Sequence, residues 1–334
     1  MANLYCALDA GTVSTCMLCA TRDEANGTRA LLRRARVTDL GEGVDASGSL
    51  LPQAIGRTVD CIADYLAQAR GLAREQGLSL VSCLTATSAA RDASNSRDLT
   101  ARLEELGLKP QVIAGTDEAA LGLLGVTGDF MGTTVEVCDI GGGSTELSCG
   151  SRDAQGRLVQ LGAVSLNIGA RRVCERFLAC PDDEPCDPAA VRRARDFARS
   201  VFDAHLSQHA NLPETLACVG GTATTLVAVL AELDPYDSDF VHLRQTDRDA
   251  LHDLTERLLC MSTLERRGLV GLQPKRAHVI HAGALILDEL VEVGGWPGFV
   301  TSESNSLFGV VECMHAQVVG IQPPLSWNPQ MLRG

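Results

Sequence analysis

Three turns in this sequence combine glycine with aspartate, serine or threonine directly after an apolar stretch. They are Asp9-Ala10-Gly11-Thr12, Asp139-Ile140-Gly141-Gly142-Gly143-Ser144 and Gly220-Gly221-Thr222. Glycine lets the backbone approach a ligand closely and point successive amides at it, which suits the oxygens of a phosphate. The aspartates of the first two turns could hold a hydrated Mg²⁺, which takes one or two carboxylates and keeps most of its waters.

The first two turns belong to a degenerate internal repeat. When Asp9–Cys19 is set beside Asp139–Cys149, five of eleven positions are identical. They are the aspartate, the glycine two residues on, the serine–threonine pair five and six residues on, and the cysteine ten residues on. The sequence therefore predicts two related half-domains, each containing one strand–turn–strand unit.

The apolar pattern predicts the elements that must position these turns. Strands are expected on both sides of the first two turns and before the third, at residues 4–9, 14–20, 134–139, 145–149 and 216–219. The third turn is expected to open a helix, whose positive N-terminal end suits phosphate. Thr116 is expected to cap the N-terminus of another helix, which runs to about residue 124.

Length and composition predict a two-domain globular protein. The chain has 334 residues, and one domain usually contains roughly 100–200. Hydrophobic residues make up 45% of the chain but aromatic residues only 4%, so aliphatic side chains must fill the interior. Thirteen cysteines, most of them in apolar stretches, fit a reducing cytoplasm.

The net charge limits the ligands that the chain can bind. A formal charge of −13 argues against a general nucleic-acid or membrane-surface binder. The two lysines, Lys109 and Lys275, lie outside any P-loop motif, and a dinucleotide-binding G-x-G-x-x-G is absent. Binding of phosphate would therefore depend on backbone amides, arginines and a metal ion.

Together the three turns resemble the nucleotide-binding loops of the actin/hexokinase/Hsp70 superfamily. Within it, the chain resembles the exopolyphosphatase/guanosine pentaphosphate phosphohydrolase (Ppx/GppA) family in its short two-domain form. The resemblance runs from about Leu4 to Val311. The stretches that carry it are LGEGVD at 40–45, ATSAARDASN at 86–95, GTDEA at 115–119 and, most specific, DIGGGSTE at 139–146.

This resemblance implies an α/β fold of two actin-like, ribonuclease H-like domains with the active site in the cleft between them. The first domain would span residues 1–124, with a C-terminal helix at 305–318 possible as its completion, and the second 125–304. Residues 319–334 would form a proline-containing tail that is loosely held. A homodimer is compatible with the sequence.

The resemblance also implies roles for single residues. Glu118 aligns with the carboxylate proposed to activate the attacking water, and Glu146 with a second carboxylate of the site. Asp139, with Asp9, would place Mg²⁺ or Mn²⁺, and Arg91 would face a phosphate as a bidentate donor. The other phosphate ligands are expected from the three turns: Gly11, Thr12, Ser14, Gly141, Gly142, Gly143, Ser144, Gly220, Gly221 and Thr222. From the residues alone, Glu118 could equally be an acid favoured by a helix N-terminus.

The implied activity is Mg²⁺-dependent hydrolysis of inorganic polyphosphate or guanosine pentaphosphate. Three positions depart from the family pattern: Val13 stands where asparagine is usual, Asp39 where arginine is usual, and His278 where aspartate is usual. Val13 removes a polar group from a phosphate turn, and Asp39 replaces an attractive charge with a repulsive one. Val13 and Asp39 therefore leave open a non-catalytic sensor of polyphosphate or alarmone. A sugar or carboxylate kinase on the same fold is a second alternative.

Overall fold

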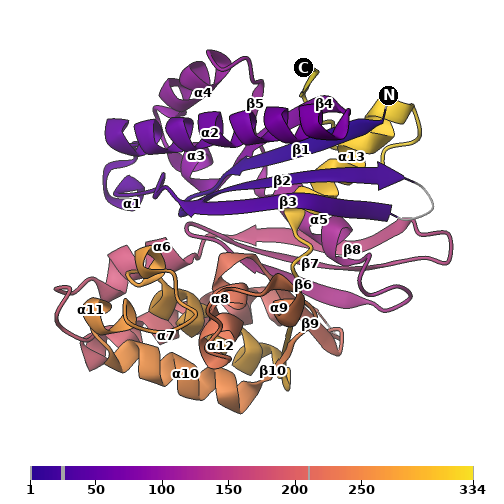
Figure 1. The fold of residues 1–334 in the computed structure, drawn as a ribbon. Coiled ribbons are helices and arrows are strands. Elements are labelled where there is room, and N and C mark those ends of the chain that lie inside the picture. The colour runs from indigo at the N-terminus through magenta and orange to yellow at the C-terminus, as the bar shows by residue number, and fades with distance from the viewer. Residues whose placement is uncertain (1, 24–26, 210, 334) are drawn as a thin grey trace. The chain divides into compact units, whose positions relative to one another are not determined.

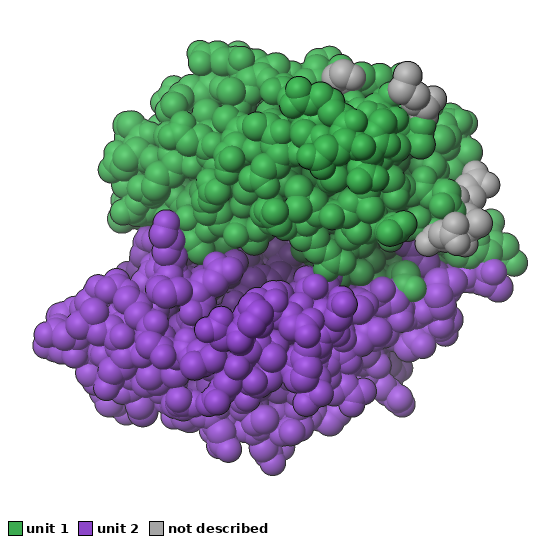
Figure 2. Space-filling view, in the orientation of Figure 1, with its two compact units in different colours: residues 1–128, 155–158, 304–334 green, residues 129–154, 159–303 purple. Residues whose placement is uncertain are grey.

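The chain forms two six-stranded sheets, and helices cover both (Figure 1). The computed structural model describes residues 2–23, 27–209 and 211–333. It divides into two units, which Figure 2 distinguishes by colour. Unit 1 contains residues 1–128, 155–158 and 304–334, and unit 2 contains residues 129–154 and 159–303.

The sheet of unit 1 has the order β12-β4-β1-β2-β3, with β5 also paired to β4. Strands β1, β2 and β3 form an antiparallel meander, whereas β4 and β5 run parallel to β1. The strand bounds are β1 Asn3–Ala10, β2 Ser14–Asp23, β3 Gly27–Val37, β4 Ser79–Ala86, β5 Pro110–Val112 and β12 Met331–Arg333.

Helices cover the two faces of this sheet because the residues of β1 are apolar on both sides. Leu4, Cys6 and Leu8 pack on one face with α2 and α4, while Tyr5 and Ala7 pack on the other with α5 and α13. The bounds are α1 Val44–Ser47, α2 Pro52–Gln76, α3 Ser88–Asp92, α4 Ser96–Glu104, α5 Gly115–Val126 and α13 Ser306–Val319. Helices α5 and α13 approach closely at Gly125, where a Cβ would lie 2.1 Å from the Asn305 carbonyl oxygen.

Unit 2 repeats this topology. Its sheet has the order β10-β11-β9-β6-β7-β8, in which β6 pairs antiparallel with β7 and parallel with β9. The bounds are β6 Val135–Ile140, β7 Thr145–Arg152, β8 Leu158–Leu166, β9 Thr215–Val219, β10 Gln245–Asp247 and β11 Gly298–Thr301. In both units an antiparallel hairpin is followed by a strand that runs parallel to its first strand, which confirms the predicted class of two related α/β domains.

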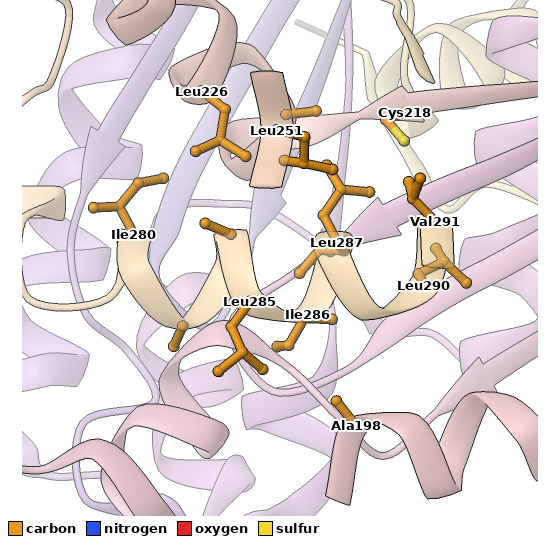
Figure 3. Packing of buried hydrophobic residues seen from close by; sticks show 14 of the residues in the cluster. Ala198, Cys218, Leu226, Leu251, Ile280, Leu285, Ile286, Leu287, Leu290 and Val291 are labelled. Atoms are coloured by element: carbon orange, nitrogen blue, oxygen red, sulfur yellow. The ribbon is translucent and has the colours of Figure 1, made fainter. Parts of the chain in front are cut away.

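Helix α12 lies at the centre of the apolar core of unit 2. Leu285, Ile286 and Leu287 of this helix are fully buried, and the side chains around them come from α7, α8, α10 and β9 (Figure 3). The helices of this unit are α6 Ala170–Val173, a π-helical turn Cys174–Leu178, α7 Pro188–Leu206, α8 Gly220–Leu230, α9 Ser238–Val241, α10 Arg248–Cys260, α11 Thr263–Arg266, a 3-10 turn Pro274–Arg276 and α12 Ile280–Gly294.

The structure corrects three expectations. Residues 331–333 form strand β12 on β4, and Trp327 is buried among the side chains under α13, so the C-terminal segment is held in place. Helix α5 begins at Gly115 with Ala114 as its N-cap, which means that Thr116 does not cap it. The expected boundary at 124–125 falls inside this helix, which belongs to unit 1.

Among the described residues, no helix is long and apolar enough to cross a bilayer. The cleft that the resemblance implies between the two units stays a prediction.

Candidate functional site

The first two glycine turns have the same backbone geometry, as the repeat predicts. The Gly11 amide donates to the Ser14 carbonyl at 3.1 Å, and the Gly141 amide donates to the Ser144 carbonyl at 3.0 Å. The registers also match, because Ala10 pairs with Thr15 and Ile140 pairs with Thr145 across the two hairpins. The sequence repeat therefore corresponds to the same strand–turn–strand structure, which occurs once in each unit.

The second turn presents amide donors that the protein itself does not use. The carbonyls of Gly141 and Gly142 accept bonds from the first residues of α6, and Arg172 Nε donates to the Gly143 carbonyl at 2.8 Å. In the described part of the chain, nothing accepts a hydrogen bond from the amides of Gly142 and Gly143, both buried residues. Buried amides are nearly always paired, so these two are suited to receive the oxygens of an anion.

Two carboxylates flank the same turn. Asp139 at the end of β6 lies directly opposite Glu146 on β7, and paired residues of neighbouring strands point to the same face of the sheet. Glu146 is 4% exposed, and the Ser165 hydroxyl donates to its Oε1 at 2.6 Å. The turn thus combines two acidic groups with two amide donors.

The backbone of the third turn lies close to the carboxylate of Asp139. Gly220 has a φ of +77°, and a Cβ there would lie 2.3 Å from Asp139 Oδ1, so both conformation and space require glycine. At Gly221 a Cβ would lie 2.0 Å from Arg276 Nη1. The Thr222 hydroxyl donates to the Ile140 carbonyl at 3.0 Å, which ties the start of α8 to the second turn. The contribution of Thr222 is therefore to hold two turns together.

The first turn is fixed by neighbours within unit 1. Thr85 of β4 donates to Asp9 Oδ1 at 2.8 Å, and the amide of Ala89 donates to Thr12 Oγ1 at 3.2 Å. A Cβ on Gly41 would lie 2.3 Å from Thr12 Cγ2, so the segment after β3 also packs tightly on the turn. The Thr12 hydroxyl joins the turn to α3, the helix that carries Arg91.

Arg91 and Glu118 form an ion pair in unit 1. Arg91 Nη1 donates to Glu118 Oε2 at 2.7 Å and to the Ile113 carbonyl at 3.0 Å. Burial raises the pKa of Glu118, and the guanidinium of Arg91 opposes that rise. Arg91, the expected phosphate ligand, is therefore paired with Glu118, the expected base. The spacing of the two residues in the sequence does not indicate this pair.

The structure distributes the predicted residues between the units. Asp9, Gly11, Thr12, Ser14, Arg91 and Glu118 lie in unit 1, and Asp139, Glu146 and the residues of the second and third turns lie in unit 2. Among the described residues, no group of three or more histidine, cysteine or acidic side chains forms a metal site. The pair Asp139 and Glu146 nevertheless fits the one or two carboxylates that Mg²⁺ takes.

A comparison with protein families identifies the relatives of this chain. The model of the Ppx/GppA phosphatase family matches residues 20–293, which is more than half of the sequence. The chain belongs to the Ppx/GppA phosphatase family. Exopolyphosphatase 2 of Mycobacterium tuberculosis is 31% identical over 323 residues, covering 91% of this chain and 96% of that protein.

Solved structures of this family share the fold. The structure of an exopolyphosphatase-like protein has a TM-score of 0.82 at 29% identity and covers 93% of this chain and 97% of its own. That of the Aquifex aeolicus Ppx/GppA family member has a TM-score of 0.74 at 25% identity, covering 96% and 99%. The predicted family and fold class are confirmed.

The three departures from the family pattern each have a place in the structure. The Val13 side chain is buried, and its carbonyl accepts from the amides of Thr38 and Asp39. Asp39 has a φ of +51°, a conformation that aspartate tolerates better than most residues. His278 Nε2 lies 2.9 Å from Arg171 Nη2. Two of the departures therefore border the first turn, and the third lies beside α6.

Sequence reasoning missed several polar residues around the turns of this family member. Arg276 lies over Gly221, Arg172 anchors the second turn, and Ser165 orients Glu146. Arg172 lies on α6, outside the three turns that the sequence motifs mark. Arg276 and Ser165 are far from the turns in sequence, so only the fold could bring them there.

Proposed function

We propose that this chain hydrolyses the terminal phosphoanhydride of inorganic polyphosphate, with guanosine pentaphosphate as a second substrate. The observation that carries the proposal is the turn at 139–146, where two unused amides of Gly142 and Gly143 stand beside the opposed carboxylates of Asp139 and Glu146. Preorganised amides are suited to stabilise the charge on a transferred phosphoryl group. The relative named exopolyphosphatase 2 supports polyphosphate as the substrate.

In this proposal Glu118 is the general base. A water molecule attacks the terminal phosphorus, its proton passes to Glu118, and the P–O bond to the penultimate phosphate breaks to release inorganic phosphate. A base must be ionised before it can accept a proton. Arg91 supports this state because it opposes the rise in the pKa of Glu118 that burial causes. Arg91 is therefore a positioning residue for the base.

The donor set of the second turn supports a role for Mg²⁺. Asp139 and Glu146 would hold the ion in unit 2, and Asp9 offers a further carboxylate at the corresponding position of unit 1. When bound, Mg²⁺ neutralises phosphate charge and polarises the phosphoryl oxygens. Gly220 contributes indirectly, because it lets the start of α8 approach the Asp139 carboxylate.

The proposal is tested by measuring phosphate release from polyphosphate, guanosine pentaphosphate and ATP in parallel, with and without Mg²⁺. Release from polyphosphate without an added acceptor is expected and would exclude the kinase alternative. Tight binding of polyphosphate without turnover would contradict the proposal and favour the sensor. Val13 and Asp39 beside the first turn are the specific observations behind that alternative.

A further inference from the structure

A strongly basic strand crosses the otherwise acidic chain. Strand β3 and the residue after it, 27–38, contain four arginines and no acidic residue, although the whole chain carries −13. Arg29, Arg33, Arg34 and Arg36 are all exposed. Clustered charge of one sign creates a local potential that attracts the opposite sign. The four arginines therefore either bind a polyanionic partner or have a structural role within the fold.

The place of β3 in the sheet leaves one of its edges open. It is the last strand of the order β12-β4-β1-β2-β3, and in the described part of the chain β2 is its only paired neighbour (Figure 1). An open edge presents backbone amides beside the arginine side chains. Arginines on such an edge also hinder pairing with other strands, which is the purely structural explanation.

The register of β3 places its C-terminal end, with Arg36, beside the first phosphate turn. Val37 pairs with Ser14, the last residue of the turn, and Arg36 pairs with Thr15. The chain then continues so that the Thr38 amide donates to the Val13 carbonyl at 3.0 Å. From Arg36 back to Arg29 the edge spans roughly 23 Å, at about 3.3 Å per residue. A basic track therefore starts at the turn and leads away from it.

Contacts hold the arginine side chains of β3 without cancelling all their charge. Arg34 donates to Gln68 Oε1 at 3.1 Å and to the Arg33 carbonyl, and neither partner is charged. The guanidinium of Arg33 lies 5.0 Å from the centroid of the Phe308 ring. Arg36 is paired with Asp64 at 2.8 Å. No carboxylate of the described chain contacts Arg29 or Arg34, so these two retain the charge for a ligand.

The arginines of helix α7 differ from those of β3, because acidic side chains neutralise two of them. On α7, Arg195 contacts Asp288 at 2.9 Å and also Glu289, while Arg199 contacts Glu289 at 2.9 Å. Both charges are compensated by buried acids. The exposed pair Arg192 and Arg193 on the same helix provides a matched control of equal charge.

We propose that the open edge of β3, with Arg29, Arg33 and Arg34, binds the distal phosphates of a long inorganic polyphosphate chain whose end reaches the first turn. This inference rests on the proposed function for its substrate class. The regular negative charge of polyphosphate suits an edge with Arg29 and Arg34 on one face of the sheet, Arg33 on the other and backbone amides between them. A short substrate held at the turn does not reach Arg29, which lies roughly 23 Å along the edge from Arg36.

The test is a binding measurement that needs no turnover. The dissociation constants of long polyphosphate and of tripolyphosphate are determined by calorimetry in the Glu118→Gln background, with and without Arg29→Gln/Arg34→Gln. Removing two exposed charge contacts should weaken binding of the long chain about three- to tenfold. Tripolyphosphate affinity should change less than about twofold, and the difference should shrink at high salt because exposed charges are screened.

Controls separate this surface from general electrostatics. Arg192→Gln/Arg193→Gln removes the same charge from α7 and should leave both affinities within about twofold. Arg29→Lys/Arg34→Lys should retain affinity for the long chain. Equal losses for long and short ligands, or an equal loss in the α7 variant, would overturn the proposal. Single-stranded RNA competing as strongly as polyphosphate would also overturn it, in favour of a nucleic-acid surface. Failure of the proposed function would show separately, as absence of phosphate release by the unmodified chain.

Discussion

The ionisation of Glu118 depends on its ion pair with Arg91. Burial favours the neutral carboxyl and raises the pKa of Glu118, while the guanidinium 2.7 Å away favours the ionised form. A base with a raised pKa loses activity as the pH falls through that pKa. Replacement of Arg91 by Gln removes the opposing charge, so the pKa of Glu118 should rise further.

We therefore expect Arg91→Gln to move the acidic limb of the kcat profile to higher pH. The measurement is phosphate release from polyphosphate across pH 5–9, with substrate kept saturating. Arg97→Gln is the control, because Arg97 is an exposed arginine of the neighbouring helix α4 whose ion pair within the described residues is with Glu104. An unshifted acidic limb in Arg91→Gln would mean that Glu118 does not control the profile.

Glu118 and its neighbour Asp117 separate catalysis from helix stabilisation. Both are acidic residues of the first turn of α5, where the helix dipole favours negative charge. Glu118→Gln removes the base and should lower kcat about 10²–10⁴-fold. Asp117→Asn removes the same charge from the same turn and should cost about 0.3–1 kcal/mol of stability with kcat nearly intact. Equal kcat values in the two variants would reduce Glu118 to a helix-stabilising residue.

Glu136 is a buried acid that the proposed chemistry does not use. It lies on β6 with 5% exposure, and burial raises its pKa to about 7. Since the folded state holds the proton of Glu136 more tightly than the unfolded state, the contribution of this group to stability is most favourable at low pH and is lost between about pH 4.5 and 7. The gap between these pKa values corresponds to about 3 kcal/mol.

Glu136→Gln should abolish this pH dependence. It keeps the shape and polarity of the side chain but cannot ionise, so the variant should gain stability over the natural protein at pH 8 and little at pH 4.5. Urea unfolding at the two pH values measures the difference. A gain that is equal at both values would indicate better packing in place of a suppressed ionisation.

At the scale of elements, the strands and glycine turns could be predicted because each depends on a short run of sequence. The hairpins around Gly11 and Gly141 have the apolar runs and turn residues that define them locally. Strand β12 could not be predicted, because its three residues follow a proline-containing segment and it is a strand only through pairing with β4. Thr116 is a suitable cap by residue type, but the N-cap of α5 is Ala114, two residues earlier.

The start of α8 is an element whose position depends on one glycine. In Gly220→Ala the new Cβ would collide with Asp139 Oδ1 and would also sit on a left-handed backbone. We expect a loss of at least about 1 kcal/mol of stability and, because Asp139 must move, a higher Mg²⁺ concentration for half-maximal activity. Thermal unfolding and an Mg²⁺ titration measure the two effects.

Gly71→Ala is the matched contrast for this substitution. Gly71 lies inside α2, and a Cβ there meets no atom within 4 Å. Alanine should therefore stabilise the helix by about 0.5–1 kcal/mol with activity unchanged. If Gly220→Ala behaved like Gly71→Ala, the close approach of α8 to Asp139 would have no importance for the site.

At the scale of the whole molecule, the sequence repeat anticipates the paired topology of the two units but not the contacts around the turns. Asp9 meets Thr85, Gly221 meets Arg276, and Arg91 meets Glu118 through pairings of distant elements. Each contact needs the relative placement of two elements that are far apart in the sequence, which no local pattern contains. The residues of the turns could therefore be named from sequence, whereas the groups that orient them could not.

The net charge of −13 makes one further property of the whole molecule testable. A polyanionic substrate is repelled by a protein of the same sign, and the phosphate turns carry Asp9, Asp139 and Glu146 as additional negative groups. Backbone amides alone supply only partial charges against this repulsion. Productive binding of polyphosphate should therefore require a divalent cation.

We expect EDTA to abolish phosphate release and Mg²⁺ or Mn²⁺ to restore it. Sodium chloride at matched ionic strength should not restore activity, because screening weakens repulsion beyond about 8 Å but does not bridge a carboxylate to a phosphate. Asp139→Asn removes one ligand charge and should raise the Mg²⁺ concentration required, whereas Asp182→Asn, an exposed acid paired with Arg267, should not. Undiminished turnover in EDTA, or full recovery with sodium chloride, would show that the arginines and amides of the chain bind the substrate without a metal ion.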